Sequence, residues 1–410
     1  MTEQPVHAIA VIGAGTMGSG IAQVAATHGC TVHLIDVNAE VLRHGLDAIK
    51  KNLDRAVEKG RMTAPDRDAT STRIHTRGEI GNLKDVELAI EAVVEDLAIK
   101  QRVFRDLEAA TPPSAVLASN TSSLSVTKIA EALKDPGRVI GMHFFNPAPI
   151  MPLVEIIAGE KSAAAAVEAG FAVATAWGKT AVRAADTPGF IVNRVARGYY
   201  LEALRLLGEG VAGIDEIDNV CRVHGGFKMG PFELMDLVGL DVNLAVSTSV
   251  WEQMERHPRF SPHEIQQKLV EQGRLGRKTG RGFYAYATSA PPVSAYPVDR
   301  RSFQLSPLLS GAVRAFADRA GARNAGSTEQ YVFARILSAI LNEAALALDE
   351  GVASREDIDI AMQKGTNYPK GPLAWTDEIG LWTVRGLLRA MNDSVSDRRY
   401  APAKSFADAG

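Results

Sequence analysis

The amino-acid sequence predicts an N-terminal α/β domain followed by a region built from α-helices. Two observations support this prediction. Up to Ser162, short apolar runs alternate with helix-like segments, as in a parallel sheet covered by helices. After Ser162 the chain changes to long alanine- and leucine-rich segments, parts of which recur at a constant offset of 141 residues. The composition, 46% hydrophobic and 23% charged, is ordinary for a globular protein.

Charge and cysteine usage exclude several classes of protein. A net charge of −3 gives no electrostatic footprint for nucleic acid or an anionic membrane. Cys30 and Cys221 are far apart in apolar surroundings, so we predict no disulfide framework and no metal site, as suits a reducing cytosol. No window holds eighteen uninterrupted apolar residues, and we therefore expect a cytoplasmic protein without a membrane span.

The segment "VHAIAVIGAGTMGSGIAQVAATHGCTVHLIDVN" predicts a strand, a glycine turn, a helix and a second strand. Gly13, Gly15 and Gly18 form G-x-G-x-x-G. The first glycine permits the tight turn, the second lets the backbone approach a pyrophosphate, and the third lets the helix pack on the strand. The pyrophosphate would bind at the helix N-terminus, where Thr16 and Met17 stand. The sequence therefore predicts a Rossmann-type domain that binds a dinucleotide.

The second predicted strand ends at Asp36, eighteen residues after Gly18. A carboxylate there can accept hydrogen bonds from both ribose hydroxyls and would repel a 2′-phosphate. We therefore predict that the cofactor is NAD rather than NADP.

A charged helix is predicted from Val41 to Gly60, and it carries Arg55 and Lys59. Two interpretations remain open at this point. The charges can belong to a solvated helix face, or the two cations can bind a ligand phosphate.

Polar residues follow three further predicted strands. "VELAIEAVVEDLAIK" places Glu95 at the carboxyl end of a strand with Lys100 five residues later, and "AVLASNTSSL" places Asn120 and Ser122 at the next. Ser122 alone is more simply a helix cap. "RVIGMHFF" then places His143 on the same rim, where open α/β sheets bind ligands.

His143 opens the stretch "HFFNPAPIMPLVEI", in which Glu155 follows twelve residues later within an apolar run. The pair can be a hydrogen-bonded core histidine with a strand-end carboxylate. It can also be a general base with its orienting acid, because a histidine has a reference pKa of roughly 6.5 and an adjacent carboxylate stabilises its protonated form.

Several motifs together resemble the 3-hydroxyacyl-CoA dehydrogenase family, in family order over residues 6–286. They are "VIGAGTMGSGIAQVAA", "IEAVVEDLAIK", "SNTSSL", "HFFNPAPIMPLVEI", "DTPGFIVNR", "GFKMGPFELMDLVGLDV" and "GRLGRKTGRGFYAY". The resemblance implies NAD-dependent oxidation of an acyl-CoA substrate at C3. It departs from the family at Pro152, where a lysine is common.

The resemblance also implies roles for individual residues. His143 matches the catalytic base, Glu155 its partner, Ser122 a serine that contacts substrate and cofactor, and Asn193 the asparagine that polarises the substrate's 3-oxygen. The nicotinamide- or ribose-side cofactor contacts would be Glu95, Lys100, Asn120, Asn146 and Lys278, and the CoA phosphate contacts Lys59 and Arg55.

The internal repeat predicts duplication of one helical unit. Under the offset of 141, Glu202 recurs as Glu343 and Asp218 as Asp359, whereas Ala334 replaces Asn193. The second copy is therefore predicted to be structural. It could mimic within one chain the dimer contact that the family's helical domain commonly forms, and a homodimer remains possible.

These patterns predict five segments. Residues 1–186 form the NAD-binding Rossmann domain, 187–286 the first helical copy, 287–326 a linker with a connecting helix, 327–395 the second copy and 396–410 a tail. We expect no enoyl-CoA hydratase domain before the first strand.

The layout resembles family members that act on 3-hydroxyadipyl-CoA or 3-hydroxybutyryl-CoA, in phenylacetate degradation or β-oxidation. Two alternatives remain open: a non-catalytic, crystallin-like NAD(H)-binding protein, and a β-hydroxyacid dehydrogenase that uses a lysine as its acid–base.

Overall fold

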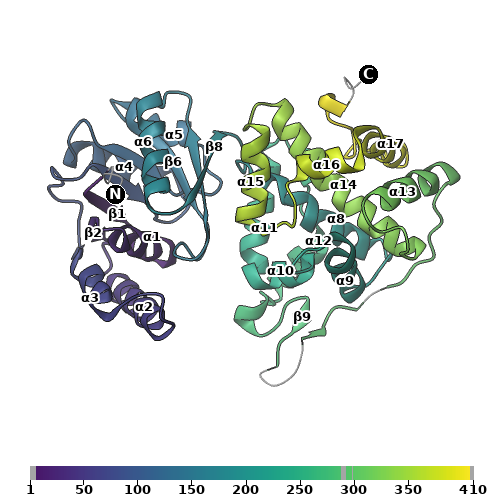
Figure 1. Ribbon diagram of the computed structural model, residues 1–410, viewed down its shortest axis with the longest axis horizontal. Coiled ribbons are helices and arrows are strands. Elements are labelled where there is room, and N and C mark those ends of the chain that lie inside the picture. Colours follow the sequence, from purple (N-terminus) through teal and green to yellow (C-terminus); the bar gives the residue numbers. More distant parts are fainter. Residues whose placement is uncertain (1–5, 288–291, 298, 407–410) are drawn as a thin grey trace. The chain divides into compact units, whose positions relative to one another are not determined.

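The computed structural model describes residues 6–287, 292–297 and 299–406. The chain divides into two compact units, unit 1 (Met1–Phe190) and unit 2 (Ile191–Gly410), which Figure 1 shows in purple to teal and in teal to yellow.

Unit 1 is built on one eight-stranded sheet of order β3-β2-β1-β4-β5-β6-β7-β8. The strands are β1 (Ala8–Ile12), β2 (Thr31–Ile35), β3 (Ile74–Arg77), β4 (Leu88–Glu91), β5 (Val116–Ser119), β6 (Val139–Phe144), β7 (Leu153–Ala158) and β8 (Thr180–Ala185). The first six run parallel. Every residue of β4 and β6 is buried, as expected for strands covered on both faces. The predicted Rossmann-type parallel sheet is confirmed.

The sheet reverses direction at β7, which the sequence analysis did not predict. β7 pairs antiparallel with β6 and parallel with β8. A fully buried strand is apolar on both faces, so its sequence does not distinguish a parallel from an antiparallel neighbour.

The helices of unit 1 connect these strands, and their strongest start signals are polar caps. Asn38 accepts hydrogen bonds from two N–H groups at the start of α2, and Asp96 accepts one at the start of α4. The helices are α1 (Thr16–Thr27), α2 (Ala39–Glu58), α3 (Ala64–Thr72), α4 (Leu97–Ala110), α5 (Val126–Ala130), the 3₁₀ turn η1 (Pro136–Arg138) and α6 (Ala164–Ala176).

The position of Glu95 differs from the prediction. β4 ends at Glu91, and Glu95 lies four residues later, in the loop before α4. The intervening Val93 and Val94 continue the apolar pattern of the strand, but the backbone has already left the ladder, because the N–H of Val93 donates to the Glu91 side chain at 2.7 Å.

Unit 2 is mostly helical. Its helices are α7 (Val192–Val195), α8 (Arg197–Gly208), α9 (Ile214–Gly225), α10 (Pro231–Val238), α11 (Leu240–Gln253), α12 (Glu264–Glu271), α13 (Pro307–Arg319), α14 (Ser327–Asp349), α15 (Arg355–Gly365), α16 (Pro372–Ile379) and α17 (Leu381–Asn392). The 3₁₀ turns are η2 (Pro258–Phe260), η3 (Arg277–Thr279) and η4 (Lys404–Phe406). A two-stranded sheet joins β9 (Tyr284–Ala285) to β10 (Val293–Ser294). Part of the predicted linker, residues 288–291 and 298, lies outside the described residues.

Helix α14 runs through the core of unit 2. Among the described helices it is the one that is long and apolar enough by itself to cross a membrane, and the bent pair α10–α11 passes the same test together. However, 78% of the apolar window of α14 is buried inside the protein. The apolar surface of this helix is therefore used for packing, chiefly against α8 and α9.

Two buried arginines of unit 2 bind carboxylates in the same pattern. Arg194 binds Glu343 (Nε–Oε1, 2.6 Å) and Glu350 (Nη1–Oε2, 2.7 Å). Arg335 binds Glu202 (Nη2–Oε2, 2.9 Å) and Glu209 (Nη2–Oε1, 3.2 Å). The two sets are equivalent under the offset of 141 residues, which relates Arg194 to Arg335, Glu202 to Glu343 and Glu209 to Glu350.

Two aspartates that are 141 residues apart, Asp218 and Asp359, also make equivalent contacts. Asp218 accepts hydrogen bonds from the N–H groups of Phe232 and Glu233, at the start of α10. Asp359 accepts them from Leu373 and Ala374, at the start of α16. Each carboxylate caps a helix that begins at the equivalent proline, because the first N–H groups of a helix have no partner within it.

Replacing Glu202 by Gln should destabilise unit 2 in a pH-dependent way. Burial alone would raise the pKa of Glu202, but Arg335 and Arg205 outweigh burial and lower the pKa from 4.5 to about 2. A lowered pKa stabilises the fold above pH 4.5, and this contribution is lost as the pH falls from 4.5 towards 2. The shift corresponds to about 3 kcal/mol.

Urea unfolding of the wild type and of Glu202→Gln at pH 7, 4 and 3 measures this effect. We expect a difference in unfolding free energy of about 3 kcal/mol at pH 7 that narrows at pH 4 and further at pH 3. A difference that stays constant with pH would show that ionisation of Glu202 does not stabilise the fold.

Candidate active site

The glycine turn of unit 1 is shaped by close backbone contacts. Gly13 has φ +100°, and a Cβ there would lie 2.5 Å from the carbonyl oxygen of Ala92. A Cβ on Gly18 would lie 1.8 Å from the carbonyl oxygen of Gly13. A Cβ on Gly15, in contrast, would have no protein atom within 4 Å. Two of the glycines are thus required by the packing of the protein itself, whereas the middle one faces open space.

Gly15 is also the N-cap of α1, and no side chain caps this helix. Thr16 is exposed and Met17 is half-buried. The first N–H groups of α1 can therefore bind an anion that approaches over Gly15. These residues fit the pyrophosphate of a dinucleotide.

Asp36 directly follows β2 and is held in place by two backbone groups. Its Oδ2 accepts a hydrogen bond from the N–H of Ala14 at 2.9 Å, and its Oδ1 accepts one from the N–H of Asn38 at 2.9 Å. Each oxygen retains lone-pair capacity for a ribose hydroxyl.

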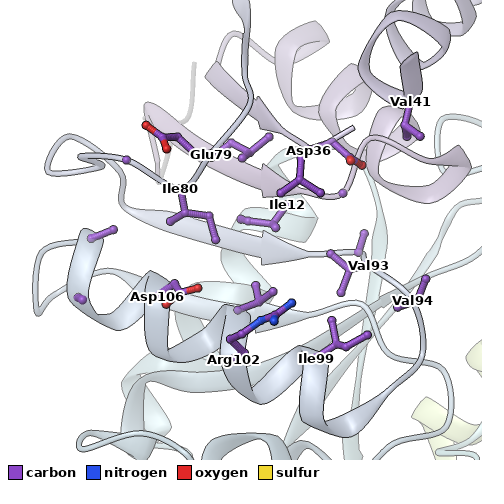
Figure 2. A pocket seen from close by; sticks show the side chains of 18 of the residues that line it. Ile12, Asp36, Val41, Glu79, Ile80, Val93, Val94, Ile99, Arg102 and Asp106 are labelled. Atoms are coloured by element: carbon purple, nitrogen blue, oxygen red, sulfur yellow. The ribbon is translucent and has the colours of Figure 1, made fainter. Parts of the chain in front are cut away.

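A cavity of about 1200 Å³ extends from the glycine turn along the surface of α4. Figure 2 shows Asp36 at one end, with Ile80 from the loop after β3 on one side and Arg102 of α4 on the other. Most of the lining is aliphatic, as expected for an adenosine site. His143 does not line this cavity. The cavity therefore accounts only for the adenosine end of the site.

A carboxylate–lysine–carboxylate cluster, in which Glu91 and Lys100 are buried and Glu95 is exposed, lies beyond the carboxyl end of β4. The ammonium of Lys100, which is 1% exposed, donates to Glu91 at 2.6 Å and lies 3.1 Å from Glu95. Glu91 also accepts from the hydroxyl of Ser119 at 2.7 Å. Because Lys100 is itself buried, it affects the accessible part of the site through its ion pair with Glu95.

Glu95 holds the loop that follows β5. It accepts hydrogen bonds from Thr121 Oγ1 (2.6 Å), from the Ser122 N–H (3.0 Å) and from the Ser123 N–H (3.1 Å). Burial would raise the pKa of Glu95, but Lys100 and these donors outweigh burial and lower it. Glu95 is therefore ionised at neutral pH, and its charge fixes the backbone at Ser122.

The same loop is tied to its neighbours on both sides. The side-chain oxygen of Asn120 accepts from the N–H of Phe144 on β6 at 2.9 Å. Asp186 accepts from Ser125 Oγ at 2.7 Å and from two N–H groups at the start of α5. Hydrogen bonds and an ion pair therefore connect Glu91 on β4, through the loop after β5, to the residue next to His143.

His143 and Glu155 are directly opposite each other in the antiparallel ladder of β6 and β7. Directly opposite residues place their side chains on the same face of a sheet. His143 Nδ1 lies 2.6 Å from Glu155 Oε2, and the two residues are 5% and 0% exposed. If the carboxylate accepts from Nδ1–H, Nε2 of the neutral imidazole is a proton acceptor.

Aromatic rings enclose the histidine. The ring centroid of His143 lies 4.5 Å from that of Phe145 and 5.8 Å from that of Phe190. Phe190 is buried and has φ +47°, a conformation that is strained for a bulky residue. The strained backbone places the ring of Phe190 against the imidazole of His143.

Lys179 fixes the loop between β6 and β7, which carries the exposed Asn146. Its ammonium donates to the carbonyl oxygens of Ala148 (2.6 Å) and Met151 (2.9 Å), and burial lowers its pKa. The Asn146–Pro147 peptide bond is cis.

The remaining predicted residues belong to other elements. Arg55 and Lys59 are exposed at the end of α2 and do not line the cavity. Asn193, on α7, and Lys278, on η3, belong to unit 2. The ammonium of Lys278 binds Asp241 at 2.6 Å.

Glu91, Lys179 and Asp186 were not predicted from the sequence as residues of the site. A signal for Glu91 was present, because a glutamate within the apolar run "LAIEAVV" must have a partner if the strand is buried. Lys179 and Asp186 bind loops distant in sequence and carry no comparable signal.

Comparison with known proteins decides the family. The model for the NAD binding domain of 3-hydroxyacyl-CoA dehydrogenase matches residues 8–187, and the model for the C-terminal domain matches residues 189–286 and 331–409. The chain belongs to the 3-hydroxyacyl-CoA dehydrogenase family. The predicted family and its NAD cofactor are confirmed, and the chain is an NAD-dependent dehydrogenase of this family.

Individual members of the 3-hydroxyacyl-CoA dehydrogenase family cover the whole chain or part of it. A 3-hydroxyadipyl-CoA dehydrogenase of Escherichia coli is 38% identical over 97% of this chain and 96% of its own length. A 3-hydroxybutyryl-CoA dehydrogenase of Mycobacterium tuberculosis is 41% identical over 68% of this chain and 99% of its own length. The crystal structure of a 3-hydroxybutyryl-CoA dehydrogenase from Escherichia coli matches with a TM-score of 0.87 at 38% identity, covering 98% of both chains.

The glycine turn generates a prediction with a built-in control. Gly15→Ala should fold normally, because its Cβ meets no protein atom, but it should weaken NADH binding at least roughly tenfold by blocking the pyrophosphate. Gly18→Ala should lower the unfolding free energy by about 2 kcal/mol or more, because its Cβ overlaps the Gly13 carbonyl.

Thermal unfolding and NADH fluorescence titration of the two variants separate these effects. Unchanged NADH affinity in Gly15→Ala would mean that the pyrophosphate does not pass over this residue.

Proposed function

We propose that this enzyme oxidises a (3S)-3-hydroxyacyl-CoA to the 3-oxoacyl-CoA, with His143 as general base and Glu155 as its partner. The observation that supports this most directly is the buried contact of 2.6 Å between His143 Nδ1 and Glu155 Oε2. NAD, when bound, accepts the hydride that leaves C3 of the substrate.

His143 takes the hydroxyl proton at Nε2 as the hydride leaves, and returns it in the reverse reaction. An imidazolium among Phe145 and Phe190 would be costly by itself, and the charge of Glu155 offsets that cost. Positioned acid–base catalysis of this kind contributes roughly a hundred- to ten-thousandfold.

The other site residues have proposed roles in binding. Ser122 contacts substrate and cofactor, and Asn193 polarises the 3-oxygen. Glu95, Asn120, Asn146 and Lys278 contact the cofactor, with Lys100 acting through Glu95. Lys59 and Arg55 bind the phosphates of CoA.

The helical region is proposed to consist of two copies of one unit, residues 187–286 and 327–395. The family model matches this region in two segments, and the arginine–glutamate and aspartate-cap contacts repeat at the offset of 141. The two copies would form within one chain the contact that a dimer forms between chains.

The proposed substrate is 3-hydroxyadipyl-CoA or 3-hydroxybutyryl-CoA, since relatives that cover nearly the whole chain carry both names. Family membership favours the histidine-dependent mechanism over a lysine-dependent one. A buried, carboxylate-paired histidine also favours catalysis over a binding role alone.

Replacing His143 by Ala should lower kcat by at least roughly a hundredfold and leave NADH affinity within about twofold, because His143 does not line the adenosine cavity. Glu155→Gln should lower kcat less, since Nδ1 keeps a hydrogen-bond acceptor. Steady-state kinetics and NADH titration measure both effects. Full activity of His143→Ala would overturn the proposed mechanism.

The substrate is tested by NADH consumption with acetoacetyl-CoA and 3-oxoadipyl-CoA on one preparation. A kcat/KM at least about tenfold higher for 3-oxoadipyl-CoA is expected if a cation in the site recognises the distal carboxylate. A preference for acetoacetyl-CoA would instead assign a short-chain substrate, and no turnover of either would support the binding role.

A further inference from the structure

Asn193 lies on α7, a helix that is too short to be stable by itself. Helix α7 has four residues, a single turn. It begins two residues after the strained Phe190 and leads through Ala196, which is in helical conformation, into α8. A single turn is not stable by itself, so the placement of α7 depends on α8, which it adjoins, and on the other elements that contact it. Those elements include α14 and α15, from the C-terminal part of unit 2.

The residue next to Asn193 anchors this helix. Arg194 is fully buried, and its guanidinium binds Glu343 on α14 and Glu350 at the C-cap of the same helix. A buried cation is held firmly in place by its carboxylates, because losing one leaves an uncompensated charge. Two directed hydrogen bonds to a planar guanidinium also fix its orientation.

The equivalent arginine, Arg335, is not next to a candidate catalytic residue. Arg335 binds the equivalent Glu202 and Glu209, and also donates to the hydroxyl of Tyr400 at 2.9 Å, but its neighbour is Ala334 rather than an asparagine. Glu350 and Glu209 are similarly placed, with side chains 46% and 42% exposed. The contacts of Arg335 therefore serve as a control for the Arg194 clamp, by which we mean Arg194 with Glu343 and Glu350.

We infer that Glu350 and Glu343 are positioning residues, which hold the amide of Asn193 in its working orientation through Arg194. The C-terminal segment of the chain, which carries no asparagine at the equivalent position, would thereby take part in the reaction. This inference rests on the proposed role of Asn193 in polarising the substrate's 3-oxygen.

The test compares Glu350→Gln with Glu209→Gln in the full-length chain. Both variants remove one half-exposed carboxylate from a buried arginine, so both should lower the melting temperature. Glu350→Gln should lower kcat by roughly tenfold, because small displacements of a polarising group are costly, and Glu209→Gln should keep kcat within about twofold. The KM for NADH should stay within about twofold in both, since the adenosine cavity lies in unit 1.

Two outcomes would overturn the inference. Unchanged kcat in Glu350→Gln would show that the clamp does not position Asn193, and equal loss of kcat in both variants would show an effect of stability alone. Asn193→Ala separates this inference from the proposed function. If Asn193→Ala keeps full activity, the role of Asn193 is wrong; if it is inactive and Glu350→Gln is not, the inference about the clamp is wrong.

Discussion

The antiparallel pairing of β6 with β7 is the constraint on which the candidate active site depends. A histidine and a glutamate twelve residues apart face each other because the chain reverses between them and the register places His143 opposite Glu155. A register shift of one residue would turn one of the two side chains to the other face of the sheet. The buried, apolar neighbours on both strands oppose such a shift, since it would also move the core residues.

The polar residues at the carboxyl ends of β4, β5 and β6 form one connected system. The ammonium of Lys100 lies between the carboxylates of Glu91 and Glu95, and Glu95 fixes the loop that carries Ser122. Asn120 connects that loop to the backbone beside His143. Hydrogen-bonded networks with a buried centre are rigid, which suits a site that must align a cofactor, a substrate and a base.

Much of the fold and of the site could be predicted from the sequence because the strongest signals are local. The three glycines, Asp36 and the apolar strands each meet a requirement of the backbone or of burial at their own position. The partner of Lys100, the clamp of Lys179 and the reversal at β7 depend on contacts between distant segments, and a single sequence carries no mark of them. Glu95 was placed on the wrong element because Val93 and Val94 continue an apolar pattern after the ladder has ended.

The two arginine clamps of unit 2 have a consequence for how this protein can change. In an assembly of two identical chains, every substitution appears twice, so both sides of a symmetric contact must tolerate it. Here Arg194 and Arg335 belong to one chain, and each can be altered while the other stays constant. Under the proposed duplication, Ala334 at the position equivalent to Asn193 is a difference of this kind, because one copy carries the amide and the other does not. If the two segments are copies of one unit, as proposed, joining them in one chain would free one copy to diverge while its contact with the other is kept.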